Sequence, residues 1–285
     1  MPNYSIIHKQ DIFITEKYSP DIGKDGLGFL SRSFERHFNE RPYLDHTCYL
    51  FLTKTTRERS RQQSNWNTLC RKFLVPKEIQ DRETLERFME SVGQFESIVN
   101  DSGLVRLERL STEEITGTED GPGVIERYLT LSADGSVMLQ DMQLNPDEMR
   151  IGDKRLCLHT LSDLDDLPGR VRTDGRYERL STDRSDCRLS YASPVGIMLP
   201  CDHIYNQWIF IDDSGENLAR FEKTAKNMQS LSRYSRSNQI NKEWLDEYLN
   251  VAHTNGLQSV RCHCNVIAWA ESGDELRRVK NDVGS

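Results

Sequence analysis

Short apolar segments alternate with longer amphipathic ones in the last third of the chain, and this alternation restricts the fold more than any other feature. The segments 204–212 and 257–270 are apolar and rich in β-branched and aromatic residues, which is typical of strands. Between them, apolar residues recur every three or four positions, first over 218–231 and then over 240–251. Gly256 stands where the second stripe ends. The pattern predicts a strand, two helices and a strand, followed by a further helix that begins near Asp274.

The first third shows the same two kinds of segment. Leu30, Phe34 and Phe38 are four residues apart, which predicts a helix that Pro42 ends. Asp81 is a candidate N-cap for a long helix that ends near Gly103. Alternating polarity predicts strands at 4–15 and 104–110, and a segment rich in Thr, Tyr and Phe predicts another at 43–54.

These elements predict an α+β fold with mixed sheets and several packed helices. Short strands with turns between them are expected over 136–162, and a long polar connection over 163–189. The 285 residues are enough for two domains of ordinary size. We expect an N-terminal β-α-β-α-β lobe at 1–110 and a second α+β lobe at 111–285.

Composition narrows the class of protein. No segment approaches the roughly 20 apolar residues of a membrane-spanning helix, and the N-terminus does not resemble a signal peptide. The seven cysteines are irregularly spaced and mostly lie in apolar runs, which favours reduced structural thiols over a disulfide framework. These features predict a cytoplasmic location. The strand-like start and the helix-like end lead us to expect a piece of a longer protein.

An apolar segment that ends in Asp212 and Asp213 resembles the strand with which ATPases present a carboxylate to Mg²⁺. That chemistry also needs a glycine-rich phosphate loop, and the sequence G-x-x-x-x-G-K-[ST] is absent. We therefore interpret both aspartates, together with Ser214, as the end of a strand and the cap of the next helix.

Two further groups of residues suggest chemistry but have simpler interpretations. Cys262 and Cys264 flank His263, and a second pair of ligands for zinc could come from Cys201 and His203. In a strand, however, both thiols of the first group point to one apolar face. The acidic residues of 163–189 are interspersed with arginines, which is more typical of an ion-paired surface than of a catalytic carboxylate pair, although an unrecognised enzyme site in this connection stays open.

The most unusual feature is a basic stretch inside an acidic protein whose formal net charge is -8. Between Lys54 and Lys72 there are six basic residues and a single acidic one, Glu58. The candidate docking residues are Arg57, Arg59 and Arg61 with, on the preceding helix, Arg32 and Arg36. Such a stretch is either a solvated loop or a surface for an acidic protein, anionic lipid or nucleic acid. Because Trp66 is the only aromatic residue between the cations, a base-stacking platform is disfavoured.

Several long blocks resemble the TraG family of conjugation ATPases, as found in Bacteroides-type conjugative transposons. They extend from about residue 4 to residue 283. The blocks are FLSRSFERHFNERPYLDHTCYLFLTKTTRERSR, NDSG, EITGTE, MRIGDKRLCLHTLSDLDDLPG, YERLSTDRSDCRLSYASPVG and NMQSLSRYSRSNQINKEWLDEYLN.

The resemblance implies a part of a hexameric cytoplasmic ATPase that powers type IV secretion, similar in role to the large ATPase of VirB-type systems. In that family an N-terminal region precedes a RecA-like motor. This sequence is similar to the N-terminal region and departs from the family pattern because it has no motor. No catalytic or nucleotide-binding residue is carried over, so we expect no enzyme activity, no metal and no cofactor here. ATP and Mg²⁺ are expected in the motor domain.

The family also implies a docking role. The expected partners are inner-membrane secretion-channel proteins, the motor domain and neighbouring subunits of the hexamer. We therefore expect a non-catalytic docking and assembly domain that is cytoplasmic and peripheral at the inner membrane. The alternative is a DNA-contacting module of the transfer machine, in which nucleic acid binding is weak because the net charge is negative.

Overall fold

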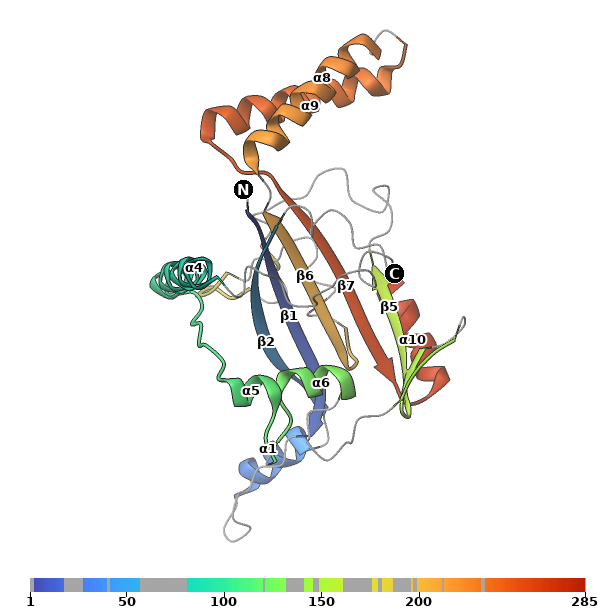
Figure 1. Ribbon diagram of the computed structural model, residues 1–285. Coiled ribbons are helices and arrows are strands. Elements are labelled where there is room, and N and C mark those ends of the chain that lie inside the picture. Colours follow the sequence, from blue (N-terminus) through green and yellow to red (C-terminus); the bar gives the residue numbers. More distant parts are fainter. Residues whose placement is uncertain are drawn as a thin grey trace. The chain divides into compact units, whose positions relative to one another are not determined.

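The computed structural model describes residues 3–17, 28–39, 42–56, 81–119, 121–131, 141–145, 149–160, 176–178, 181–186, 196, 199–211, 213–231 and 234–284. Within them, seven strands form one antiparallel sheet in the order β2-β1-β6-β7-β5-β4-β3 (Figure 1). The strands are β1 (Asn3–Lys17), β2 (Pro42–Thr56), β3 (Met142–Leu144), β4 (Met149–Ile151), β5 (Lys154–Thr160), β6 (His203–Ile211) and β7 (Val260–Ala270).

Seven helices accompany the sheet in the part of the chain that the structure describes. They are α1 (Phe29–Asn39), α4 (Arg82–Asp101), α5 (Thr112–Thr116), α6 (Val124–Thr130), α8 (Ser214–Leu231), α9 (Arg236–Asn255) and α10 (Gly273–Gly284). The predicted α+β class is confirmed, and nothing in the described residues indicates a RecA-like motor. None of the described helices is both long and apolar enough to cross a membrane.

Two compact units are made of interleaved segments. One contains 1–8, 50–107 and 208–263, and the other contains 9–49, 108–207 and 264–285. The expected division into lobes at 1–110 and 111–285 stays a prediction.

Helix ends follow the predicted capping residues. Helix α4 begins directly after Asp81, whose carboxylate accepts a hydrogen bond from the hydroxyl of Thr84. Helix α9 ends at Gly256, which has φ 60°, a left-handed conformation that costs glycine little. Helix α8 starts at Ser214, and Asp213 Oδ1 accepts a hydrogen bond from the backbone N–H of Glu216 at 3.0 Å. Asp213 therefore caps α8, in agreement with its interpretation as a capping residue.

The predicted strand at 104–110 is wrong, because these residues are irregular. The backbone N–H of Leu107 donates to Asn100 Oδ1 at 2.7 Å, so a side chain takes the place of a neighbouring strand. Leu104 is 88% exposed and covers no core.

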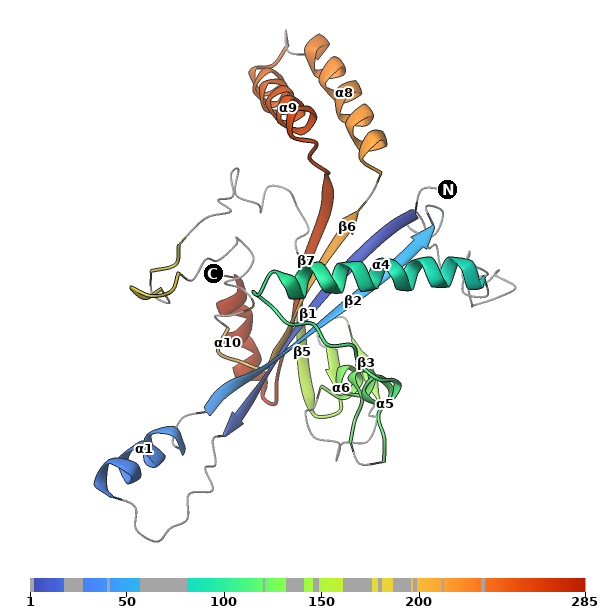
Figure 2. The same cartoon turned by 90° about the vertical axis from the view of Figure 1, so that its left-hand side faces the viewer.

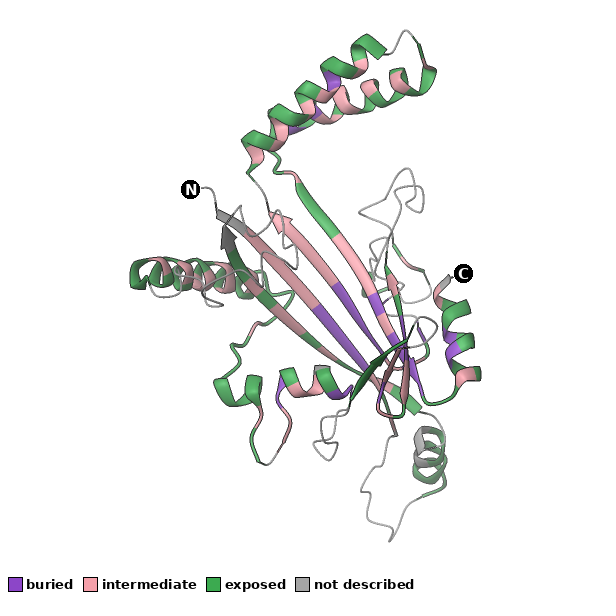
Figure 3. Cartoon of the chain, turned by 45° about the vertical axis from the view of Figure 1, so that its right-hand side comes forward, coloured by how far each residue is buried: buried purple, intermediate pink, exposed green. Residues whose placement is uncertain are grey.

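One core lies in the second unit between the sheet and α10. Strand alternation places every second residue of β6 and β7 on this face, and Leu276 and Val279 of α10 pack against them. The buried residues of this core are Cys157, Leu199, Tyr205, Val266, Ala268, Ala270, Leu276 and Val279. Cys264 packs against it, as the strand periodicity predicted. Figure 3 shows that buried positions gather on the strands.

A second core, also within the second unit, includes Leu131 at the end of α6. Its buried members are Ile12, Leu131, Ile151, Leu156, Ile204 and Trp269. Next to Ile12 and Ile204 along their strands, a chain of side-chain amides crosses three neighbouring strands. Gln10 Nε2 donates to Asn206 Oδ1 at 3.3 Å, and Asn206 Nδ2 donates to Asn265 Oδ1 at 3.0 Å. Because buried amides are costly unless paired, this chain favours one register of β1, β6 and β7.

Candidate functional site

Three of the five candidate docking residues, Arg57, Arg59 and Arg61, lie outside the described residues. The other two, Arg32 and Arg36, lie one helical turn apart on α1, and both are exposed. The docking role of all five stays a prediction. The structure adds the surroundings of the two arginines on α1.

Helix α1 presents apolar side chains to solvent. Phe29 is 83% exposed, Leu30 is 81% exposed and Phe34 is 57% exposed. At 100° per residue, Leu30 and Phe34 fall on one side of the helix while Arg32 and Arg36 fall on the other. No described side chain of α1 is buried. A helix of 11 residues is marginal in water by itself. Helix α1 is therefore amphipathic, with Arg32 and Arg36 on the side away from Leu30 and Phe34.

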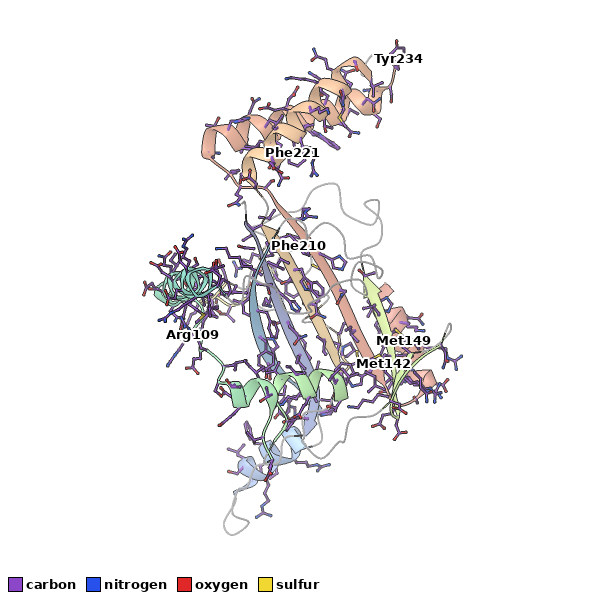
Figure 4. All side chains as sticks on the ribbon, in the orientation of Figure 1. Arg109, Met142, Met149, Phe210, Phe221 and Tyr234 are labelled. Carbon is purple, nitrogen blue, oxygen red and sulfur yellow. The ribbon has the colours of Figure 1, made fainter. Side chains whose placement is uncertain are left out.

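A second exposed apolar surface lies in the first unit, on the hairpin of α8 and α9 (Figure 2). The seam between these helices contains Ala225, Leu249 and Ala252, and the ring of Phe221 meets that of Tyr248 edge to face. Outside the seam, Trp244 is 61% exposed, and Tyr234, at the turn between the helices, is 85% exposed (Figure 4). Leu231, Ile240 and Val251 are also exposed.

A polar cluster that the sequence did not reveal surrounds Asp11 in the second unit. The carboxylate is buried, with 4% of the side chain exposed. It accepts hydrogen bonds from Lys9 Nζ and from the thiol of Cys48, and its Oδ1 lies 2.9 Å from His46 Nε2. Burial pushes the pKa of Asp11 upward, but the three hydrogen bonds outweigh it and leave this pKa below its ordinary value.

A cysteine, a histidine and an aspartate in one cluster suggest a nucleophilic site, but their geometry opposes that chemistry. An activated cysteine must donate its proton to a base and keep a low pKa. Here the thiol of Cys48 donates a hydrogen bond to the carboxylate of Asp11. Burial and this bond raise the pKa of Cys48 to about 11. We interpret the cluster as a structural link between β1 and β2.

The ring of His46 takes part in a stack across three neighbouring strands. Phe13 lies between His46 and His203, with ring centroids 4.4 Å and 4.5 Å away and interplanar angles of 9° and 12°. His203 is fully buried, and its two ring nitrogens each lie 2.7 Å from a backbone carbonyl oxygen, of Cys201 and of Gly196. Either neutral tautomer of His203 thus donates to one of these carbonyls. Packing of this kind explains the histidine without a metal.

The other groups that suggested chemistry have structural surroundings wherever they are described. His263 packs against Trp208, while Cys264 faces the core beside α10. Cys262 is exposed and does not join that core, unlike the prediction. Five cysteines, at 48, 157, 201, 262 and 264, are free thiols. Over the described residues no group of three or more His, Cys, Asp or Glu side chains is arranged to hold a metal ion. Asp212 lies outside the described residues.

The polar connection is described at 176–178 and 181–186. Arg176 Nε lies 3.3 Å from an oxygen of Asp186 and 3.6 Å from one of Glu178, and all three side chains are largely exposed. This part of the connection is the ion-paired surface that its composition favoured. The rest of 163–189 lies outside the described residues.

Sequence reasoning missed the cluster around Asp11 although a signal was present. Lys9 and Asp11 are two residues apart in one predicted strand, and His46 and Cys48 are two apart in another. Each pair therefore shares a face of its strand. The pairing of β1 with β2 was the missing information.

No protein-family model matches the chain, and no curated protein is significantly similar to it.

Proposed function

We propose that this chain is a docking and assembly domain of a conjugative DNA-transfer ATPase, which couples the motor to the inner-membrane secretion channel. The observation that carries the proposal is helix α1, which exposes Leu30 and Phe34 on one side and Arg32 and Arg36 on the other. The sequence blocks that resemble the TraG family supply the identity of the machine. In this proposal the domain is cytoplasmic and held at the inner membrane by its partners.

The energetics suit a docking helix. Complete burial of a Phe or Leu side chain that is otherwise exposed contributes about 1.5–3 kcal/mol. The exposed apolar residues of α1 are thus sufficient to anchor a modest interface once a partner covers them. Arg32 and Arg36 add positive charge on the opposite side of the helix, which favours a groove with an acidic rim and accelerates association. An acidic groove on a channel protein is the partner that this helix fits best.

A second partner is proposed for the hairpin of α8 and α9. Trp244 and Tyr234 are aromatic residues of the kind enriched at interfaces between proteins. Contact with the motor domain or with a neighbouring subunit would cover them. In this proposal ATP and Mg²⁺ bind to the motor and the chain itself performs no chemistry.

The proposal is tested by in-cell photo-crosslinking of the full-length ATPase in a donor strain, with the photoreactive residue at position 33 of α1. We expect a crosslink to an inner-membrane channel protein. Leu30→Asp should reduce its yield at least tenfold, because a charge replaces the apolar anchor. Ser31→Asp, with the same added charge on the adjacent exposed position, should leave the yield within twofold. Equal yields for the two variants would refute docking through α1.

The alternative, a DNA-contacting module, rests on the basic stretch around Arg57, Arg59 and Arg61. It predicts DNA affinity that falls steeply as salt increases and is lost when all three are changed to Ala. Electrophoretic shift of single- and double-stranded DNA by the purified chain tests it. Binding that is insensitive to salt or to the triple substitution would exclude this alternative while leaving the docking proposal intact.

A further inference from the structure

A small cavity lies in the second unit between α6 and the sheet. Its volume is about 50 Å³. Side chains from four strands and from the α6 segment surround it: Ile12, Ile14, Asp45, Thr47, Tyr49, Arg127, Leu131, Ile204 and Trp269. Neither the sequence blocks nor the docking proposal accounts for such a cavity.

Two residues that line this cavity, Arg127 and Trp269, each carry a buried hydrogen-bond donor without an acceptor among the described atoms. Trp269 is 4% exposed, and its indole Nε1–H has no acceptor among the described atoms. The same holds for the buried Nε–H of Arg127. A buried donor without a partner costs about 1–3 kcal/mol, so two on one cavity indicate that something with lone pairs belongs there.

The charges around the cavity favour a negative occupant. Arg127 brings its positive charge to the wall, and Lys154 Nζ lies 5.9 Å from the centre of the Trp269 ring. Asp45 also lines the cavity, but it is exposed, so solvent screens its charge. The two buried polar atoms are both donors. The part of the wall formed by Arg127 and Trp269 is therefore complementary to an anionic oxygen.

The wall is held in place before any occupant arrives. Lys154 on β5 donates a hydrogen bond to the backbone carbonyl of Leu131, which ends α6 with φ 52°. This bond ties the end of the helix to the sheet one turn beyond Arg127. A binding site fixed in this way loses little entropy when it is filled.

The size and the apolar lining of the cavity limit the class of ligand further. A cavity of this kind needs about 10–15 Å³ to hold one water molecule, so the cavity has room for a few waters or a few non-hydrogen atoms. Ile12, Ile14, Leu131 and Ile204 form apolar walls. We propose that the cavity binds a short-chain monocarboxylate, whose oxygens accept from Trp269 Nε1 and Arg127 Nε while its alkyl group meets the isoleucines. A ligand this small is expected to bind with a Kd of about 1–10 mM.

The test is an acetate titration followed by the indole N–H signals of the whole ¹⁵N-labelled chain. The chain has 4 Trp residues, and Trp269→Phe assigns the signal of interest. We expect the Trp269 signal alone to shift saturably with acetate, at ionic strength held constant with chloride. Acetamide, which has the same shape without the charge, should bind with at most a tenth of the affinity of acetate.

Substituted proteins provide a second test. Arg127→Met should weaken acetate binding at least tenfold, whereas Arg278→Met, which removes the same charge from an exposed position on α10, should leave it unchanged. The unaltered signals of Trp208 and Trp244 report that each variant is folded. No shift of Trp269 with about 100 mM acetate, far above a millimolar Kd, would overturn the proposal and assign the cavity to water. Equal binding of acetamide would overturn the carboxylate assignment.

Discussion

The imidazole of His8 lies nearly parallel to the indole of Trp208, with ring centroids 4.5 Å apart and an interplanar angle of 11°. Phe51 stacks against His8 at 5.3 Å, and His263 meets Trp208 at 5.5 Å. These rings come from β2, β1, β6 and β7, which are successive neighbours in the sheet. A single aromatic row thus crosses four strands within the first unit.

The stacking has a consequence for the DNA alternative. A base-binding platform needs ring faces that are open to the nucleic acid. His8 is covered by Trp208 on one face and by Phe51 on the other, so its exposed part is an edge. The cation of Arg261 lies 5.3 Å from the centre of the Phe210 ring and covers that ring as well. The row is better suited to fix the register of the strands than to bind bases.

We first predict that Trp208→Ala destabilises the protein far more than Trp244→Ala. Trp208 is partly buried and stacked, so its loss removes both apolar burial and ring contacts, about 2–3 kcal/mol of the free energy of unfolding. Trp244 is 61% exposed, and its replacement should change that free energy by less than about 0.5 kcal/mol. Urea denaturation followed by circular dichroism measures both. Equal losses would show that the aromatic row does not stabilise the sheet.

The second prediction concerns pH. Because the pKa of Asp11 is lower in the folded protein than its ordinary value of 3.8, the carboxylate stabilises the fold at every pH above that value. This contribution is lost as the pH falls through the lowered pKa. Asp11→Asn should therefore reduce the free energy of unfolding by about 1–3 kcal/mol at neutral pH. The melting temperatures of the original protein and of Asp11→Asn should converge only below about pH 4. A difference that stays constant down to pH 3 would contradict the role of the ionised carboxylate.

Cysteine reactivity provides the third prediction. Only the thiolate reacts with iodoacetamide, and burial with hydrogen bonding raises the pKa of Cys48 from 9.0 to about 11. At pH 8 the native protein should alkylate Cys48 about 100-fold more slowly than an unperturbed thiol. Among the described cysteines, Cys201, whose pKa burial raises to about 12, should react more slowly still, and the exposed Cys262 should react first. Peptide mapping by mass spectrometry reads each site separately. Rapid alkylation of Cys48 in the native protein would show that the hydrogen bond to Asp11 does not stabilise the protonated thiol.

Local patterns were enough to predict most of the elements. The alternation around Ile12 predicted β1, and the helical stripe beginning at Leu85 predicted α4 although no residue of that helix is buried. The segment at 104–110 has the same alternation but forms no strand, because pairing depends on a neighbour that the pattern cannot name. Asn100 supplied the hydrogen bond instead.

Prediction of the candidate site would have depended even more on knowing which distant segments of the chain pair. Asp11 meets His46 and Cys48 only because β1 and β2 are neighbours in register, and Arg127 meets Trp269 only because α6 lies over β7. The spacing of these residues along the sequence does not reveal either contact. The exposure of Leu30 and Phe34 was likewise hidden, since an amphipathic pattern predicts a buried face and here that face is open.

The last prediction concerns the turn that positions α6 and thereby Arg127. The backbone N–H of Gly123 donates to Glu126 Oε2 at 3.0 Å and begins the helix. A Cβ at Gly123 would lie 2.2 Å from the backbone nitrogen of Gly117 and 2.5 Å from the carbonyl oxygen of Ile115, so backbone atoms would have to move. Gly123→Ala should therefore lower the free energy of unfolding by about 1–3 kcal/mol.

Gly121 is the matched control, because a Cβ there meets nothing within 4 Å. Gly121→Ala should leave the free energy of unfolding within about 0.5 kcal/mol of the original value or raise it slightly, since alanine restricts the unfolded chain. In Gly123→Ala the indole signal of Trp269 should also shift, because displacement of α6 alters the wall of the cavity that Arg127 and Trp269 share. Chemical denaturation and the indole N–H spectrum measure the two effects. If both alanine variants behave alike, the close approach of Gly123 to the backbone of Ile115 and Gly117 is not what positions α6.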